Sequence, residues 1–341
     1  MLSFFNVLIE QFWSLQQYLF ESAIQPLMLK IGLANLLEDA FDGTGWLLLG
    51  LLQIVLLLLV IRPLERWRPV EPITDRDSIK TDIFYTLLHR LGIFNLLMFF
   101  SLNPIFDYLS GKLHVAGIPT FNLDNIWPGF TDEPIVSLIV YFIILDFVGY
   151  WVHRAQHHFN WWWALHAVHH SQRQMTMWTD NRNHLIDDVI QSGITAILAQ
   201  LIGVPPGQFI AVTLISQLSQ SLQHANLRLS FGYWGKRLWV SPAFHRLHHG
   251  MSIGHENKQI TLSEDGQIQE KFVLGGHNFG ILLPCWDIFF STANWDRTYL
   301  PTGIRDQVEA GDHCIANYGN SFLSQQWLGI KRLFNIGMGN K

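Results

Sequence analysis

Residues 134–158 of the chain read PIVSLIVYFIILDFVGYWVHRAQHH. The part before His153 contains a single charged residue, Asp146, and approaches the roughly 20 mostly apolar residues that a bilayer-spanning helix needs. His153 and His157 follow at once, and residues four apart lie on one face of a helix. We therefore predict a transmembrane helix that continues beyond the bilayer and carries metal-binding histidines.

Other apolar stretches extend this prediction in both directions along the chain. Residues 43–61 are uncharged and rich in leucine, and residues 83–106 form a second apolar stretch. Residues 189–223 are also uncharged, but the sequence VPPG at residues 204–207 is a turn signal. We interpret this last region as a helical hairpin that either just spans the bilayer or dips into it and returns.

Positive charge predicts the orientation of these helices. Basic residues cluster between residues 62 and 80, whereas residues 103–133 contain only Lys112. Loops rich in Lys and Arg stay in the cytoplasm, so the first of these segments is expected there and the second on the far side. All the histidine clusters then fall on the cytoplasmic face.

The composition excludes several classes of protein. Charged residues make up 14% of the chain, against about 25% in a typical soluble domain. The net charge of −5 and the lack of a basic stripe argue against a nucleic-acid partner. Cys285 and Cys314 form no CxxC pair, which excludes disulfide scaffolds, iron–sulfur clusters and thiolate zinc sites. The first basic residue is Lys30, which argues against a secretory signal peptide.

These observations predict an all-α integral membrane protein with about four transmembrane helices, including the hairpin, and a cytoplasmic histidine-rich helical cap. Apolar residues between Phe5 and Leu19 repeat at helical spacing, which favours an interfacial amphipathic helix within residues 1–40. Residues 259–270 contain a turn signal and favour a small β-hairpin. The expected parts are residues 1–40, residues 41–133 with two transmembrane helices and a far-side loop, the catalytic domain at residues 134–302, and a tail at residues 303–341.

Two further histidine clusters share the spacing H-x2-H-H. They are His166-Ala-Val-His169-His170 and His245-Arg-Leu-His248-His249. Residues three and four apart share a helix face, so each cluster is expected to point at one site. His224 stands alone at the end of the apolar hairpin and is expected to be a further ligand.

The number of histidines predicts the number of metal ions. Neutral imidazole binds iron, zinc, copper and nickel, and one zinc ion takes about four ligands. Eight or nine histidines are too many for one ion and enough for two. A pair of redox ions with open positions can bind and split O₂, and two iron ions are therefore the preferred filling.

Other polar residues have less certain roles. His158 points about 140° away from His153 on an ideal helix, so it is expected to support the ligands or the fold, and His184 is either a ligand or such a support. Carboxylates commonly orient metal-binding imidazoles; the candidates are Asp146, Asp180, Asp187 and Asp188, the last two being alternatively a solvated helix start. The run of tryptophans at residues 161–163 is interpreted as an anchor at the membrane interface.

Taken together, three stretches give the sequence a recognisable pattern: WVHRAQHH, WALHAVHHS and SPAFHRLHHG. With HNFGILLPCWDIFFST from His277 and the segment around His224, they resemble the fatty acid hydroxylase and sterol desaturase superfamily over residues 140–302, roughly half the chain. The polar stretch between His249 and Asn278 is longer than in many members, which leaves the substrate class open.

The resemblance implies a membrane di-iron oxygenase that uses O₂ to hydroxylate or desaturate a sterol, fatty acyl chain or related lipid in the bacterial inner membrane or an endoplasmic-reticulum-like membrane. The implied ligands are His153, His157, His166, His169, His170, His245, His248 and His249, with His224 as the ninth. Residues expected to support the ligands or line the pocket are Asp146, His158, Arg182, His184, His277, Asn278 and Asp287.

The sequence also bears on the electron source and on rival functions. It contains no GxGxxG nucleotide-binding fingerprint, so a separate ferredoxin- or cytochrome-type donor with its reductase is expected. HExxH and ExxH motifs are absent, which argues against zinc proteases and carboxylate di-iron bundles. A membrane haem-binding electron carrier is the alternative that remains.

Overall fold

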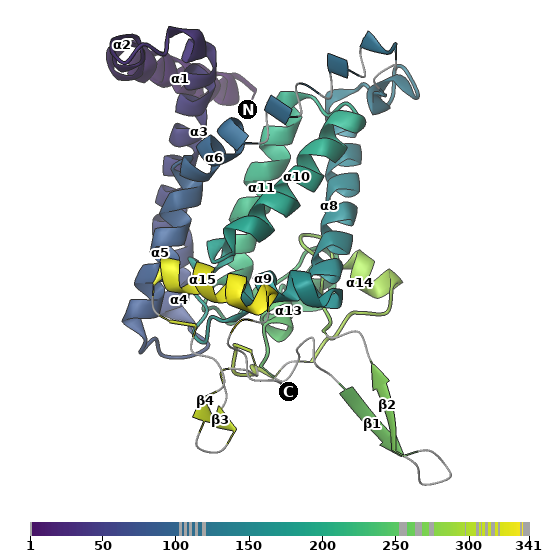
Figure 1. The fold of residues 1–341 in the computed structure, drawn as a ribbon. Coiled ribbons are helices and arrows are strands. Elements are labelled where there is room, and N and C mark those ends of the chain that lie inside the picture. Colours follow the sequence, from purple (N-terminus) through teal and green to yellow (C-terminus); the bar gives the residue numbers. More distant parts are fainter. Residues whose placement is uncertain are drawn as a thin grey trace.

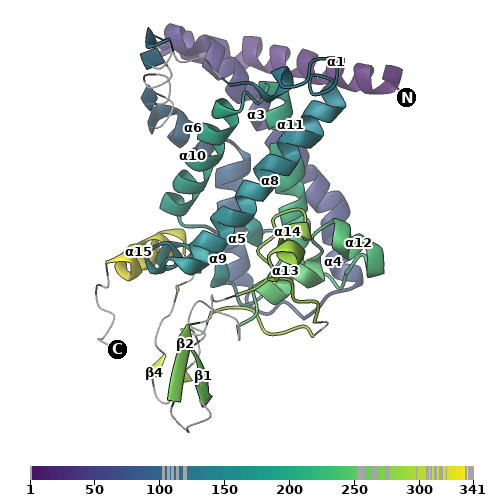
Figure 2. The same ribbon diagram turned by 90° about the vertical axis from the view of Figure 1, so that its right-hand side faces the viewer.

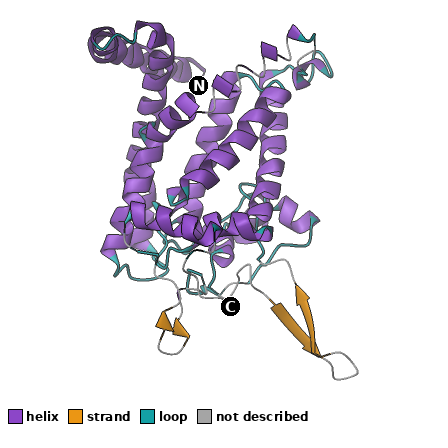
Figure 3. Ribbon diagram, viewed as in Figure 1, coloured by secondary structure: helices purple, strands orange, loops and turns teal. Residues whose placement is uncertain are grey.

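The computed structural model is mostly helical, and its only strands in the described part form two short hairpins (Figure 3). The all-α prediction is therefore correct except for these hairpins. The residues described are 2–101, 104–105, 108, 111–112, 115–117, 121–251, 258–262, 268–272, 276–296, 298–304, 307, 309–310, 313–314, 318–319, 321–334 and 336.

The N-terminal helix lies across one end of a set of upright helices (Figures 1 and 2). It begins as α1 (Leu2–Leu19) and passes through a π-helical turn, η1 (Phe20–Ile24), into α2 (Gln25–Lys30). A helix within residues 1–40 is thus confirmed, and its crosswise position is the one expected of a helix lying at an interface.

Among the described residues, two helices are long and apolar enough to cross a membrane by length and composition. The first covers Ala34–Trp67 and includes the predicted stretch at residues 43–61. The second is α8 (Pro134–His158), which continues past residue 152 to carry the first histidines, as predicted. The segments of the first are η2 (Ala34–Leu36), α3 (Leu37–Leu56), the π-helical η3 (Leu57–Ile61) and α4 (Arg62–Trp67).

The predicted helix over residues 83–106 is wrong as a single crossing. Asp75 caps the start of α5 (Arg76–Arg90) by accepting a hydrogen bond from Ser78 N, and the chain then turns before α6 (Ile93–Ser101). The turn is made by Gly92 with φ +80°, a left-handed conformation that glycine adopts readily at helix ends.

The apolar region at residues 189–223 does fold as a helical hairpin. Its arms are α10 (Leu185–Leu201) and α11 (Pro206–His224), and Gly203 makes the turn with φ +73°. A Cβ at Gly203 would press on the backbone at Phe121 and Asn122, so the turn depends on glycine. The hairpin packs against α8 through a buried cluster of Leu145, Ala199 and Val212.

Short helices form a layer at the end of the upright helices that lies opposite α1 (Figure 1). The predicted β-hairpin is confirmed in its strands, which pair antiparallel near the same end, and its turn lies outside the described residues. The elements here are α9 (Asn160–His170), η5 (Thr179–Asn181), α12 (Gly232–Leu238), α13 (Pro242–His248), β1 (Lys258–Leu262), β2 (Ile268–Phe272), α14 (Cys285–Phe289), β3 (Glu309–Ala310), β4 (His313–Cys314) and α15 (Phe322–Leu333). The short helix η4 (Leu123–Asn125) lies instead at the opposite end, where Leu123 N donates to Ile202 O beside the turn between α10 and α11.

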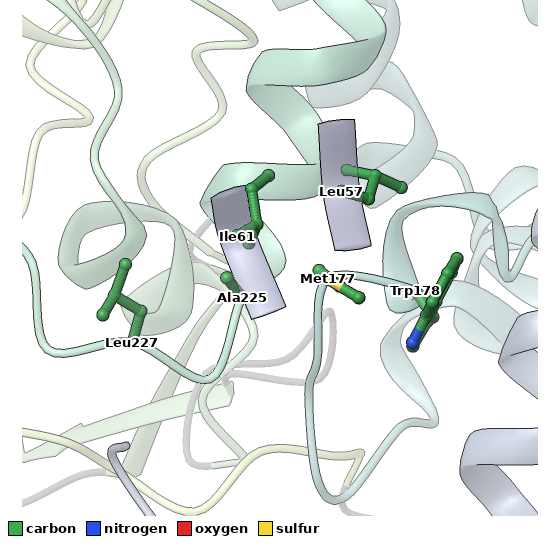
Figure 4. Close-up of a cluster of buried hydrophobic side chains, with 6 residues drawn as sticks. All are labelled: Leu57, Ile61, Met177, Trp178, Ala225 and Leu227. Carbon is green, nitrogen blue, oxygen red and sulfur yellow. The ribbon is translucent and has the colours of Figure 1, made fainter. Parts of the chain in front are cut away.

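A buried apolar cluster joins the N-terminal helices to two loops of this layer. Leu57 and Ile61 of η3 pack against side chains in the loop before η5 and in the loop after α11 (Figure 4). Their partners are Met177, Trp178, Ala225 and Leu227. Both loops lie next to histidines that the sequence identifies as ligands.

Candidate metal centre

Breaks between helices bring the three histidine clusters together. Phe159 adopts an extended conformation, with φ −88° and ψ 121°, and separates α8 from α9. The first cluster therefore ends α8, while the second lies on a helix that turns away from it. The third cluster lies on α13, which starts at Ser241: its hydroxyl accepts a hydrogen bond from Phe244 N, and Pro242 occupies the first turn.

All nine predicted ligands are buried and lie in two groups. Within each group, one ligand atom from every histidine lies within 4.8 Å of the others. We call them the five-histidine group and the four-histidine group. The first contains His153, His157, His166, His170 and His248, and the second contains His169, His224, His245 and His249.

The second and third clusters are each divided between the two groups, so the expectation that each points at one site is wrong. His166 and His170 enter the five-histidine group, and His169 enters the other. The third cluster does the reverse, because His245 and His249 enter the four-histidine group and His248 the five-histidine group. On a helix the residue at i+3 points about 100° away from the residue at i+4. The shared H-x2-H-H spacing thus sends two imidazoles to one group and one to its neighbour.

The imidazole nitrogens within each group nearly touch. In the four-histidine group, His224 Nε2 lies 3.1 Å from His169 Nε2 and 3.0 Å from His245 Nε2, which lies 3.2 Å from His249 Nε2. In the other group, His157 Nε2 lies 3.1 Å from His170 Nε2. The rings of His170 and His249 stack with centroids 4.2 Å apart and join the two groups.

Backbone carbonyl groups fix the orientation of four imidazoles. His153 Nδ1 donates to Phe279 O at 2.9 Å, and His248 Nδ1 donates to His277 O at 2.8 Å. In the four-histidine group, His169 Nδ1 and His224 Nδ1 do the same; their acceptors are Arg182 O at 3.2 Å and Gln220 O at 2.8 Å. Because Nδ1 carries the proton in each case, Nε2 keeps its lone pair for a metal ion.

A buried carboxylate orients a fifth imidazole. Asp187 Oδ2 accepts a hydrogen bond from His166 Nδ1 at 3.0 Å. Its other oxygen, Oδ1, accepts from Trp162 Nε1 at 2.6 Å and from Gln156 Nε2 at 2.8 Å. Of the two readings that the sequence left open for Asp187, the structure supports the orienting carboxylate rather than a solvated helix start.

The same contacts correct the interpretation of the tryptophan run as an interfacial anchor. Trp161 is exposed, but Trp162 and Trp163 are buried. Trp162 donates to Asp187, and the ring of Trp163 packs against His157 and His170 with centroids 4.9 and 5.3 Å away. The helix break at Phe159 turns α9 inward, so two of the three indoles support the metal groups.

Electrostatics favour the neutral imidazole at five of the candidate ligands. Burial lowers the pKa of His169, His170 and His245 well below the usual range, and the neighbouring imidazoles lower each pKa further. The same two causes lower the pKa of His249 and, burial first, that of His248. A neutral imidazole is the form that binds a metal ion.

The donor set fits two transition-metal ions. His166 Nε2 and His248 Nε2 are buried without a hydrogen-bond partner, although Nδ1 of each ring is bonded. A buried polar atom left in this way costs about 1–3 kcal/mol unless a partner is supplied. Ligand groups of five and four imidazoles, with lone pairs turned inward, supply what iron, zinc, copper or nickel requires.

Several predicted supporting residues lie away from the imidazoles. His158 is exposed at the end of α8. His184 caps α10, since its Nδ1 accepts from Ile186 N and its Nε2 donates to Gln326 O at 2.9 Å. The Arg182 guanidinium pairs with the buried carboxylate of Asp82, and only the Arg182 carbonyl reaches a ligand. Sequence reasoning missed Asp82, whose signal was an acid directly before the apolar stretch at residue 83.

The remaining predicted residues hold the segment that closes the centre. Asp146 accepts hydrogen bonds from Leu282 N and the Trp286 indole, both at 2.8 Å, and so ties this segment to α8. Asn278 has φ +61° and donates through its amide to Phe244 O at 2.9 Å. His277 contributes its backbone carbonyl to His248, and its Nε2 accepts a hydrogen bond from Asn294 Nδ2.

Replacing Asp287 with alanine is expected to lower the free energy of unfolding by about 3 kcal/mol. Asp287 accepts from Phe279 N at 2.8 Å, Gly280 N at 2.7 Å and the Thr292 hydroxyl at 2.7 Å, so the substitution leaves buried donors without partners. Thermal or denaturant unfolding of the purified protein measures the change. The matched control is Asp296→Ala in the same segment, whose exposed side chain predicts an effect within about 0.5 kcal/mol. Equal effects of the two variants would contradict this role.

A family model and several known proteins are similar to the histidine-containing part of the chain. The fatty acid hydroxylase family model matches residues 138–292, which contain all nine histidines. An alkylglycerol monooxygenase of Caenorhabditis elegans is 32% identical over 152 residues, which are 45% of this chain and 26% of that protein. A Delta(7)-sterol 5(6)-desaturase of Gibberella zeae is 29% identical over 157 residues, which are 44% of this chain and 47% of that protein.

A putative methylsterol monooxygenase of Dictyostelium discoideum is 28% identical over 129 residues, 37% of this chain and 48% of that protein. The chain thus spans about a quarter and about half of the first two relatives. No solved structure matches the chain.

Proposed function

This chain belongs to the fatty acid hydroxylase and sterol desaturase superfamily through residues 138–292, and we propose that it is a membrane-bound di-iron oxidoreductase that uses O₂ to oxidise a lipid C–H bond. The observation that carries the proposal is the pair of buried histidine groups. Hydroxylation and desaturation both begin with removal of hydrogen from such a bond, and relatives of both kinds match the chain.

Each group would hold one iron ion. The five-histidine group and the four-histidine group provide enough imidazoles for two ions, and the stacked rings of His170 and His249 keep the groups adjacent. When bound, the iron would supply the activation of O₂ and the redox steps. The chain's own residues hold the ligands, fix their tautomers through Nδ1 and keep bulk water away from the buried imidazoles.

A lipid substrate follows from the surroundings of the centre and from the relatives. Apolar side chains along α8 are exposed, with Ile135 at 74% and Ile139 at 51% exposure, and a hydrocarbon environment would cover them. The matching proteins are named for alkylglycerols and sterols. We propose a sterol, a fatty acyl chain or a related membrane lipid, which reaches the histidines from within the bilayer.

We propose that the protein crosses the membrane several times, with the histidines at the cytoplasmic side. The helix over Ala34–Trp67 and α8 have the length and composition to cross, and the α10–α11 hairpin would complete about four spans. Arg62 and Arg66 of α4, with Arg68 directly after it, form the end of the long helix Ala34–Trp67 that borders the histidine layer, and such a cluster favours the cytoplasm. The layer of short helices would then form the cytoplasmic cap.

We propose that the chain is divided into the parts that the sequence predicts. Residues 134–302 would form the catalytic domain, and residues 41–133 and 1–40 would supply membrane helices and the interfacial helix. Since the chain has no nucleotide-binding fingerprint, electrons would come from a separate ferredoxin- or cytochrome-type protein and its reductase.

The function is tested by comparing the lipids of cells that express the intact chain with those of cells that express a His169→Ala variant, both grown under isotopically labelled O₂. The expected result is a hydroxylated lipid carrying the label, or a desaturated lipid without it, in the first cells alone. Lipid profiles that do not differ between the two would count against a lipid oxygenase.

A haem-binding electron carrier is the rival, and the geometry argues against it. Haem iron takes at most two protein ligands along its axis, whereas groups of five and four imidazoles converge here. A visible spectrum of the purified protein separates the two functions, because a strong Soret band would point to haem.

A further inference from the structure

The four-histidine group depends on the spacing of two segments far apart in the sequence. His169 comes from α9 and is oriented by the Arg182 carbonyl directly after η5, while His224 ends α11 and is oriented by the Gln220 carbonyl. Their Nε2 atoms lie 3.1 Å apart. Any shift of η5 relative to α11 changes this distance, so whatever joins these two segments sets the geometry of the group.

Arg90, at the end of α5, joins them directly. Its Nη2 lies 2.9 Å from Asp180 Oδ2 in η5 and donates to Ser221 Oγ in α11 at 3.1 Å. Ser221 Oγ in turn donates to Asp180 Oδ2 at 2.8 Å, which closes a triangle of contacts. All three side chains are buried. Asp180 lies two residues before Arg182, and Ser221 follows Gln220, so the triangle sits next to both orienting carbonyls.

Two glutamine side chains, one from α3 and one from α11, also hold the Arg90 guanidinium in place. Arg90 Nη1 donates to Gln53 Oε1 of α3 and to Gln217 Oε1 of α11, both at 2.6 Å. Gly50 lies against the backbone of Arg90 so closely that a Cβ there would overlap its carbonyl oxygen. This close approach lets α3 reach the guanidinium, because any larger residue would push the two helices apart.

Glu65 makes a second bridge between the same two segments. Its Oε1 accepts hydrogen bonds from Met177 N at 2.8 Å and from Asn226 N at 2.9 Å. These backbone groups lie on the loops before η5 and after α11. The apolar cluster around Leu57 and Ile61 packs between the same loops (Figure 4). Glu65 therefore links the same two segments as Arg90, through other residues of each.

The five-histidine group has different supports. Asp187 orients His166, and the backbone of residues 277–279 orients His153 and His248. Within the described part of the chain, the hydrogen bonds of Arg90 and Glu65 reach none of these supports.

We propose that Arg90 and Glu65 are positioning residues for the metal ion of the four-histidine group and not for that of the five-histidine group. Both residues lie outside the family match at residues 138–292. The N-terminal helices would thus complete one half of the metal centre. This inference rests on the proposed pair of metal ions. It adds that Arg90 and Glu65, outside the family match, position the ligands of the four-histidine group.

The test measures iron per chain in Arg90→Gln after purification from iron-supplemented cells, beside the wild type. We expect about two ions in the wild type and about one in the variant, with iron affinity at the lost site falling about 10- to 100-fold as for other outer contacts of metal sites. Arg90→Gln also leaves the buried Asp180 carboxylate without its ion-pair partner, which is destabilising by itself. Arg90→Gln combined with Asp180→Asn removes both charges and is expected to lose the same single ion.

Double variants identify which ion is lost. Arg90→Gln combined with His245→Ala should retain about as much iron as Arg90→Gln alone, since both affect the four-histidine group. Arg90→Gln combined with His248→Ala should retain almost none, since the two changes affect different groups. This pattern of non-additive and additive losses separates positioning from a general effect on the fold. Lys80→Ala on the exposed side of α5 is the control and should keep both ions.

Each outcome bears on the proposal. Two ions in Arg90→Gln, or an equal loss from both groups, would overturn it. If Arg90→Gln does not fold, Glu65→Gln keeps the test, because the neutral amide still accepts from Met177 N and Asn226 N but more weakly; we expect partial loss of one ion and no change in the other. A wild-type protein without iron after supplementation would instead refute the proposed function.

Discussion

His248→Ala is expected to abolish lipid oxidation and to lower the iron content from about two ions per chain towards one. His248 supplies the imidazole that α13 contributes to the five-histidine group, and its Nδ1 is bonded to the His277 carbonyl, so Nε2 faces the other ligands. The affinity of the five-histidine group for iron should fall by more than the factor of about 10 to 100 that follows loss of a residue that only orients a ligand. Iron analysis and the labelled-lipid comparison measure the two effects.

His158→Ala is the matched control. It removes a histidine from the same layer of the molecule, but this histidine is exposed and its ring contacts only Phe159 among the contacts described. Iron content and product formation should stay at the wild-type level. If both ions were retained in His248→Ala, the assignment of this residue as a ligand would be refuted.

Asp187→Asn is expected to weaken iron binding to the five-histidine group about 10- to 100-fold and to lower activity with it. The carboxylate accepts from Trp162 and Gln156 through one oxygen and from His166 Nδ1 through the other. An asparagine that keeps its oxygen towards the first two donors turns its NH₂ group towards His166. The imidazole can avoid the clash between two donors only by moving its proton to Nε2, which removes the lone pair that would bind iron.

The measurement for Asp187→Asn is an iron titration of the metal-depleted protein, with the four-histidine ion as an internal reference. Asp77→Asn provides the control, because Asp77 is an exposed carboxylate paired with Lys80. An Asp187→Asn protein that binds both ions with unchanged affinity would show that the tautomer of His166 does not depend on this contact.

The candidate ligands could be picked out from the sequence because their spacing is a local property. Helix periodicity identifies His153 and His157 as neighbours whatever the rest of the chain does. The division of each H-x2-H-H cluster between two groups could not be found in this way. It depends on how α9 and α13 face each other across the centre, and that follows from the break at Phe159 and the cap at Ser241.

The supports of the ligands were harder to predict than the ligands. Asp187 was a candidate, but nothing in the sequence separated it from Asp188, which pairs with His89 instead. Four further imidazoles are oriented by backbone carbonyls, and every residue has one, so no residue type gives a signal. Arg90 appeared only as a charge near the start of an apolar stretch, and its contacts span 90 residues or more to Asp180 and Ser221.

The helices, too, could be predicted where a local sequence pattern decides them. The apolar stretch that became α8 was predicted correctly because hydrophobicity over a long run is decisive. The stretch at residues 83–106 misled because apolar composition continued through Gly92, where the backbone turns. Arg90, two residues before Gly92, was the available warning in the sequence, since a charge in an apolar stretch is usually paired.

The two histidine groups contain only imidazole donors and no carboxylate. Such donors do not discriminate for ferrous iron, because along the first-row divalent series copper and zinc bind nitrogen ligands more tightly. Loading with the proposed iron would therefore depend on which metal the cell makes available while the chain folds. Under this proposal, protein overproduced in zinc-rich medium would be mismetallated, intact in fold and inert in catalysis, and reconstitution should begin from chelator-treated protein under anaerobic ferrous iron.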